Sequence, residues 1–326
     1  MGYLIFMRLI KFYQLKIPNY RSRIIIIMDA LVISGGGSKG AFAGGVADFL
    51  LNHCGKEYHT FVGTSAGSLI APLLALGKIE KLKEVFTTVK NRHVFSTNPF
   101  IVKKKDGVFH TKINHFNTLR MFLLRRKTFG ETKNLRKLIE RTLTKADFNL
   151  LRAGHKEVIV TVTNLTNGKV EYKSIHECSY DDFCDWMWAS SNVVPFMSLV
   201  VKNGMEYADG GFGNYLPVKA AIERGAKEID AIVLRPQKLI VNNMPSENAF
   251  GVLLKTFDFM LNQIGDDDIL ITNLQSKVRK TRVNCYFTPR VLTENSFIFD
   301  PDQMAKWWKE GFEYAKTQSP ACYQFD

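Results

Sequence analysis

Short apolar runs alternate with longer segments of helical periodicity along most of this chain. Apolar runs bounded by glycine or polar residues are typical of strands that are buried on both faces of a sheet. The segments between them repeat apolar residues every three to four positions, as helices that cover a sheet do. This alternation predicts a three-layer α/β/α sandwich with a mostly parallel central sheet.

The elements can be placed along the chain from the same pattern. The predicted strands are Ala30–Ile33, Thr60–Val62, Val158–Val162, Lys169–Ile175, Ile229–Leu234 and Val283–Phe287. The predicted helices are Ala41–Leu51, Gly67–Leu76, Lys133–Leu143, Pro217–Arg224, Ala249–Asn262 and a last one that begins at Pro301. This last helix has Asp300 as its N-cap and Gln303 in a capping box. Its core-facing residues are Met304, Trp307, Trp308 and Phe312.

Two glycine motifs directly follow the first two predicted strands, Gly35–Gly40 (GGGSKG) and Gly63–Gly67 (GTSAG). The second has the G-x-S-x-G pattern of a strand-to-helix turn that exposes a serine hydroxyl, here that of Ser65. The first leaves backbone N–H groups free at the start of a helix, where they stabilise a developing negative charge. The two motifs together predict a nucleophile beside an oxyanion site.

The order of residues along the chain argues against a histidine as the base that serves this serine. An α/β-hydrolase triad runs Ser, then Asp or Glu, then His, and the last of the seven histidines here is His176. The best acidic candidate, Asp209, lies beyond it. Glycines follow Asp209 directly and permit a tight turn that brings the carboxylate close to another group. The sequence therefore favours an aspartate as the base.

These three motifs, in this order, resemble those of the patatin-like phospholipase family over residues 29–223. The resemblance implies a Ser–Asp dyad without histidine, with Ser65 as nucleophile and Asp209 as general base. It also implies an oxyanion hole built from the amides of Gly36, Gly37 and Ser38. Further motif residues are Gly35, Lys39, Gly40, Gly63, Gly67, Gly210 and Gly211. Lys39 stands where the family usually has arginine. The segment Ala189–Pro195 resembles the Ala-Ser segment that the family has ahead of a proline, with the proline displaced by one residue.

The resemblance implies a serine acyl hydrolase that cleaves fatty-acyl esters of lipids or phospholipids through an acyl-enzyme. Acyl transfer to an acceptor other than water is one alternative, and a lipid- or nucleotide-binding module without turnover is another. The nucleotide alternative rests on the spacing within Gly35–Gly40, which also fits a dinucleotide fingerprint. That fingerprint needs an acid about 20 residues further on, at the end of the second strand, but Glu57 precedes that strand.

We expect no metal and no cofactor. The run Asp266–Asp268 has no matched ligands elsewhere in the sequence, and adjacent acids of this kind are interpreted as the start of a helix.

Positive charge is concentrated between Lys81 and Lys145. This segment has 17 Lys and Arg against four acids, a net +13 that equals the formal charge of the whole chain. Its basic clusters, Lys103–Lys105 and Arg125–Lys127, alternate with apolar ones such as Met121–Leu124. Two interpretations stay open, a solvated basic surface and a lid that binds anionic lipid headgroups. No nucleic-acid motif accompanies the charge, so we expect no nucleic-acid partner.

The expected organisation has three parts. Residues 1–28 form an N-terminal extension, residues 29–223 the patatin-like domain with the basic insertion at 81–145, and residues 224–326 a C-terminal α/β extension packed on the same core. Residues 1–27 are interpreted either as an over-extended reading frame or as a membrane-surface segment. The five scattered cysteines and the lack of a secretory cleavage site predict free thiols in the cytoplasm, with a peripheral membrane position as the alternative.

Overall fold

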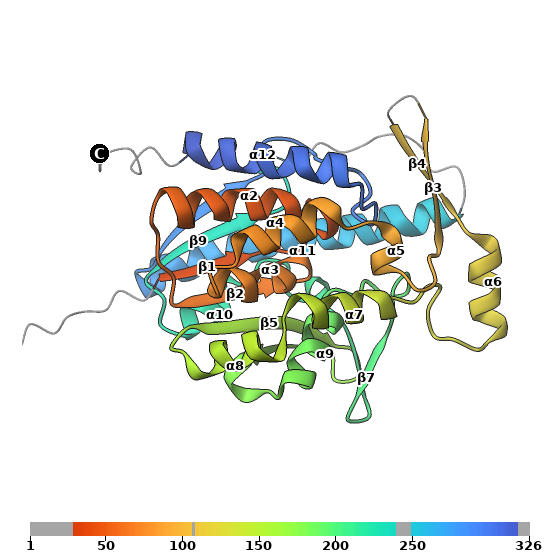
Figure 1. Ribbon diagram of the computed structural model, residues 1–326, viewed down its shortest axis with the longest axis horizontal. Helices are drawn as coiled ribbons and strands as arrows, with labels where there is room; N and C mark the ends of the chain where they lie inside the picture. Colours follow the sequence, from red (N-terminus) through yellow and green to blue (C-terminus); the bar gives the residue numbers. More distant parts are fainter. Residues whose placement is uncertain (1–28, 106–107, 239–248, 319–326) are drawn as a thin grey trace, which may run out of the picture.

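The computed structural model describes residues 29–105, 108–238 and 249–318. Within these ranges, a central eight-stranded sheet has the order β10-β9-β1-β2-β5-β8-β7, with β6 also paired to β5 (Figure 1). Its strands are β1 (Asp29–Ile33), β2 (Thr60–Thr64), β5 (Glu157–Asn164), β6 (Lys169–Ser174), β7 (Val200–Lys202), β8 (Met205–Asp209), β9 (Glu228–Val233) and β10 (Arg282–Phe287). A separate hairpin consists of β3 (Phe100–Lys105) and β4 (Val108–Ile113).

The pairing of the strands explains why the two glycine motifs meet. Strand β1 is parallel to both β2 and β9, and Ile33 lies beside Gly63 and Ile232. The carboxyl ends of β1 and β2 therefore share one edge of the sheet, where both motifs begin. Strands β10 and β5 continue the parallel part, whereas β8 and β6 are antiparallel to β5.

Helices cover both faces of the sheet. They are α2 (Gly40–Asp48), α3 (Ala66–Ala75), α4 (Ile79–Thr88), α5 (Asn91–Val94), α6 (His115–Leu123), α7 (Lys133–Thr142), α8 (Lys145–Ala153), α9 (Tyr180–Ser190), α10 (Val218–Glu223), α11 (Ala249–Arg279) and α12 (Pro301–Gln318). Helix α10 and the C-terminal half of α11 lie on one face, and α2, α3, α9 and α12 lie on the other (Figure 1). The N-terminal half of α11 packs against the core on the α2 side. The predicted three-layer α/β/α sandwich with a mostly parallel sheet is confirmed.

The residues of β1 show how the two faces are filled. Leu31 and Ile33 pack into the core on the α2 side, and Ala30 and Val32 pack into the core on the α10 side. All four side chains are fully buried. This burial on both faces explains why the sequence of the strand is continuously apolar rather than alternating.

The predicted start and N-cap of the last helix are confirmed. Asp300 Oδ1 accepts a hydrogen bond from Gln303 N at 3.0 Å, and α12 begins at Pro301. Its apolar face packs on α2 so closely that a Cβ on Gly44 would lie 2.1 Å from the ring of Trp308. Met304 and Trp307 are also buried, and Phe312 packs against the same core.

Helix α11 differs from the prediction. It extends to Arg279 instead of ending at Asn262, and Asp266–Asp268 lie inside it rather than at its start. The helix accommodates the acids because two of them have partners outside it. Asp266 forms an ion pair with Arg235, and Asp268 accepts hydrogen bonds at 3.0 Å from the Leu216 amide and from Asn214 Nδ2.

The basic segment Lys81–Lys145 is not a single insertion. Its two ends belong to the core, where Leu82 of α4 and Ile139 of α7 are buried. Only its middle part projects from the body of the molecule, as the hairpin β3–β4 followed by α6 (Figure 1). We call this part the arm (residues 98–127, of which 106 and 107 are outside the described residues). The sequence pattern did not predict its elements.

The thiols follow the prediction in part. Cys178, Cys184 and Cys285 are free, whereas Cys54 is disulfide-bonded, so the prediction is wrong at that position. Cys322 and the N-terminal residues 1–28 lie outside the described residues. In the part of the chain that the structure describes, none of the helices has both the length and the apolar character needed to span a bilayer.

Candidate active site

Ser65 occupies a sharp turn between β2 and α3. Its backbone has φ 54° and ψ −121°, a strained conformation for a residue with a side chain. The turn also needs close backbone contact. A Cβ on Gly63 would lie 2.2 Å from the Gly67 backbone, and one on Gly67 would lie 2.2 Å from the Ile33 carbonyl oxygen. The two glycines of the motif thus allow the strand to turn directly into α3 and leave Ser65 at the N-terminus of that helix.

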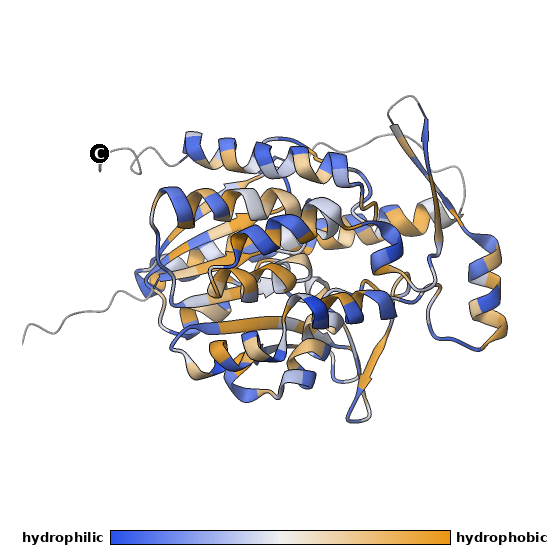
Figure 2. Ribbon diagram, in the orientation of Figure 1, coloured by the Kyte–Doolittle hydropathy of each residue, from blue (hydrophilic) through white to orange (hydrophobic). Residues whose placement is uncertain are grey.

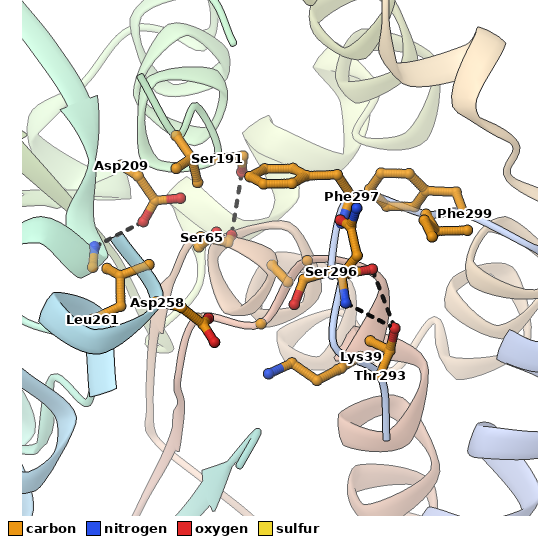
Figure 3. A pocket seen from close by; sticks show the side chains of 18 of the residues that line it. Lys39, Ser65, Ser191, Asp209, Asp258, Leu261, Thr293, Ser296, Phe297 and Phe299 are labelled. Carbon is orange, nitrogen blue, oxygen red and sulfur yellow. Dashed lines mark hydrogen bonds between the residues drawn. The ribbon is translucent and has the colours of Figure 1, made fainter. Parts of the chain in front are cut away.

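Asp209 ends β8 and lies close to Ser65 (Figure 3). Its carboxyl Oδ1 accepts a hydrogen bond from the Gly211 amide at 2.8 Å. The other oxygen, Oδ2, is buried and accepts no hydrogen bond from the described residues. The carboxyl group therefore has one oxygen fixed by the following turn and one available to receive a proton.

Burial raises the pKa of the Asp209 carboxyl to about 7. The hydrogen bond from the Gly211 amide and the nearby Ser65 hydroxyl oppose this rise, because polar hydrogens close to the ionised carboxylate stabilise it. A carboxyl group with a pKa near neutrality is suited to take up and return a proton at physiological pH.

The segment Ala189–Pro195 holds both residues in place. Ser190 Oγ accepts a hydrogen bond from the Ser65 amide at 2.9 Å, and Ser191 Oγ donates to the Ser65 carbonyl at 3.2 Å. The Asn192 carbonyl accepts from the Asp209 amide at 2.9 Å. The sequence alone does not predict this positioning role, because there the segment shows only a resemblance to a family motif. The signal was the run of three polar residues at 190–192, which begins at the last residue of α9.

The loop Gly35–Gly40 follows β1 and lies beside Ser65. A Cβ on Gly35 would be 3.3 Å from the Cβ of Ser65. The amides of Gly36 and Gly37 donate no hydrogen bond to another described residue, whereas the Ser38 amide donates to the Ser296 carbonyl at 3.0 Å. Two of the three amides implied by the resemblance, those of Gly36 and Gly37, therefore form no hydrogen bond with the described residues. The third, that of Ser38, is already hydrogen-bonded to Ser296.

The other glycines of the motifs are also closely packed. An added Cβ would lie within 3.3 Å of a neighbouring atom at Gly36, Gly37, Gly40, Gly210 and Gly211.

Lys39 lies in the same cavity, with Asp258 of α11 nearby (Figure 3). Burial lowers the pKa of the Lys39 ammonium to about 8, and the negative charge of Asp258 opposes this shift. Arg235, which follows β9, lines the cavity as well and pairs with Asp266. Asp258 and Arg235 follow the last of the motifs in the sequence, and no local pattern marked them.

These groups line a cavity of about 1800 Å³. Ser65, Asp209 and the glycine loop contribute its polar part, and the rest is largely apolar. Its apolar lining includes Leu69 and Leu73 of α3, Val85 and Phe86 of α4, Leu138 and Ile139 of α7, and Leu254, Phe257 and Leu261 of α11.

The structure places Glu57 away from the glycine loop. Strands β1 and β2 are parallel, so the loop lies at their carboxyl edge, whereas Glu57 precedes β2 at the opposite edge and is exposed. An acid that contacts a ribose has to lie near the glycine loop. The dinucleotide interpretation therefore lacks its acidic residue.

The fold and the serine turn define an α/β protein with a strand–turn–helix serine motif. The chain belongs to the patatin-like phospholipase family, since the model of that family matches residues 31–222, more than half of the chain. The predicted membership is thus confirmed.

Two further proteins are similar to this chain. An uncharacterised protein, YjjU, of Escherichia coli strain K12 is 25% identical over 224 residues, which cover 64% of this chain and 53% of YjjU. The chain thus spans about half the length of this curated relative. The crystal structure of VipD from Legionella pneumophila superposes with a TM-score of 0.51 at 15% identity, covering 90% of this chain and 67% of VipD. The second similarity concerns the fold alone.

Proposed function

We propose that this protein is a serine acyl hydrolase that cleaves fatty-acyl esters of lipids. One observation carries the proposal: Ser65, the free oxygen of Asp209 and the unengaged amides of Gly36 and Gly37 meet at an apolar cavity of about 1800 Å³. Pockets for ordinary small ligands measure about 300–1,000 Å³, so this one has room for long acyl chains. Membership of the patatin-like phospholipase family supports the lipid class of the substrate.

The reaction that we propose uses only these groups. Asp209 Oδ2 takes the proton of Ser65 as Oγ attacks the acyl carbonyl, and the Gly36 and Gly37 amides stabilise the tetrahedral oxyanion. Asp209 then returns the proton to the leaving alcohol, which breaks the ester bond and leaves an acyl-enzyme. Asp209 next takes a proton from water, and the hydroxide attacks the acyl carbon. The bond between the acyl carbon and Ser65 Oγ then breaks as Asp209 returns the proton to Oγ, which releases the fatty acid and restores the free enzyme.

The test is a panel of phospholipids, lysophospholipids and neutral glycerides, each incubated with the wild-type protein and with Ser65→Ala. We expect free fatty acid from at least one of these classes with the wild type and none above background with the variant. Transfer of the acyl group to an added alcohol in preference to water would favour the acyltransferase alternative. Absence of any acyl cleavage across the panel would contradict the proposal.

The pKa of Asp209 predicts how the rate depends on pH. The carboxyl group acts as a base only when it is ionised, and its pKa is about 7. We therefore expect kcat/KM to rise with pH, to be half-maximal near pH 7, and at pH 5 to be about 100-fold below its plateau. A soluble ester assayed from pH 5 to 9 measures this profile. A rate that is constant across this range, or half-maximal near pH 4, would contradict a base with a raised pKa.

A further inference from the structure

Helix α6 of the arm exposes a row of large apolar side chains. Phe116 and Phe122 are 76% and 78% exposed, and Leu119, Leu123 and the C-cap residue Leu124 are each more than half exposed. On the opposite side of the helix, Met121 is buried. Figure 2 shows hydrophobic positions concentrated in the central sheet, and hydrophobic positions alternating with hydrophilic ones on α6, which stands clear of the body. An exposed apolar face of this kind marks an interaction site.

The arm is also strongly basic. Residues 98–127 contain eight Lys and Arg against one acid, Asp106. Among the described residues, ion pairs are formed only by Arg126, with Glu131, and by Lys127, with Glu206. The positive charges at Lys103–Lys105, Arg120 and Arg125 therefore have no acidic partner in the described part of the chain. An apolar helix face flanked by uncompensated basic residues is complementary to a surface that is apolar within and anionic at its boundary.

The arm is continuous with the cavity that contains Ser65. Phe109 and Thr111 of β4 line this cavity, and Asn295 Nδ2 donates to Thr111 Oγ1 at 2.9 Å. Two residues of α11, Val252 and Phe259, line the cavity and are more than half exposed, so they form an apolar part of its rim. A surface that contacts the arm would therefore lie next to the entrance of the cavity.

We propose that the arm docks on a lipid bilayer with anionic headgroups. The side chains of Phe116, Phe122 and Leu123 enter the boundary between headgroups and acyl chains, while Lys103–Lys105 and Arg125 contact the anionic headgroups. This inference names the surface from which the proposed lipid hydrolase takes its substrate, and in that respect it rests on the proposed function. In this proposal, the uncompensated basic side chains and the exposed apolar face of the arm bind the same partner, the bilayer.

Binding is measured by sedimentation with vesicles of phosphatidylcholine containing phosphatidylserine, and with vesicles of phosphatidylcholine alone. Every protein in this assay carries Ser65→Ala, so that the lipid stays intact. Each basic group near such a surface contributes about fivefold to binding. The charge variant Lys103→Gln, Lys104→Gln, Lys105→Gln, Arg120→Gln, Arg125→Gln should therefore bind anionic vesicles at least about 100-fold more weakly than its parent.

Two further variants separate a docking surface from a general effect of charge. An apolar variant, Phe116→Ser, Phe122→Ser, Leu123→Ser, should bind anionic vesicles at least about tenfold more weakly, because these exposed groups lose their contact with the lipid. A matched control removes five exposed basic side chains elsewhere, and it should bind within about twofold of the parent. Its substitutions are Lys169→Gln, Lys277→Gln, Lys306→Gln, Lys309→Gln and Lys316→Gln.

Equal binding by the parent and the arm variants would overturn the docking proposal, as would an equal loss in the control. A change in sedimentation velocity without a change in vesicle binding would point instead to a second copy of the chain and would also overturn it. Hydrolysis of a short soluble ester, measured with Ser65 intact, should be the same in the arm variants and the wild type. If the wild type fails to hydrolyse any ester while arm-dependent vesicle binding persists, the proposed function fails and the docking surface stands.

Discussion

Replacement of Ser65 by alanine should lower ester hydrolysis by at least about 10⁴-fold, because the loss of a nucleophile leaves only the contribution of binding and the oxyanion site. The strained turn that presents its hydroxyl to the cavity supports this role. A fluorophosphonate should label Ser65 in the wild type, and mass spectrometry of the labelled peptide identifies the modified residue. The Ser65→Ala variant should not be labelled.

A matched control is Ser174→Ala. Ser174 is equally a buried serine but accepts a hydrogen bond from the His176 amide, remote from the cavity lining. This variant should keep both labelling and hydrolysis. Labelling of a different serine in the wild type would contradict the assignment of Ser65.

Asp209→Asn should also remove most of the activity, by about 10²–10⁴-fold, since an amide cannot accept the proton of Ser65. Single substitution of any of the seven histidines by glutamine should leave most of the rate. The measurement is kcat/KM with a soluble ester for all eight variants. If one histidine variant loses turnover while its unfolding midpoint is unchanged, a triad operates and the dyad is wrong.

The stability of Asp209→Asn separates the loss of a base from unfolding. Because burial raises the pKa of Asp209 to about 7, the folded protein binds the carboxyl proton more readily than the unfolded chain. The contribution of this group to stability is therefore full below about pH 4 and is lost as pH rises to about 7. At pH 8 the uncharged asparagine should leave the protein at least as stable as the wild type in urea unfolding. Marked destabilisation at pH 8 would mean that the carboxylate is needed for folding.

The elements that the sequence predicts correctly are those whose conformation is determined by residues close together in the chain. Strand β1 was evident because burial on both faces makes it continuously apolar, and the two glycine motifs were evident because close backbone approach admits no other residue at Gly63 and Gly67. The hairpin of the arm was missed because β3 ends in three lysines, so that only Phe100 and Val102 face the core and the alternation is too short to indicate a strand. The length of α11 was missed because the partners of Asp266 and Asp268 are distant in sequence.

Within the candidate site, too, features set by neighbouring residues were predictable and features set by distant residues were not. Ser65 and Asp209 carry glycine motifs that predict their turns, and the structure places the two residues close together. The hydrogen bonds of Ser190 and Asn192 to these residues could not be predicted, because they depend on how α9 packs against the sheet. The hydrogen bond of the Ser38 amide could not be predicted either, because its acceptor, the Ser296 carbonyl, belongs to a loop near the opposite end of the chain.

If the oxyanion hole operates as proposed, the bond between the Ser38 amide and the Ser296 carbonyl makes its third donor dependent on the position of the Ser296 loop. An acceptor within the same chain competes with substrate at a high effective concentration, so the Ser38 amide becomes available only when the Ser296 carbonyl withdraws. Loss of one such donor typically lowers kcat by a factor of about 10²–10³. In the proposed mechanism, this loop, which also bonds to the arm through Asn295 and Thr111, would therefore withhold a rate increase of about that size, in addition to the rate that Gly36 and Gly37 would support.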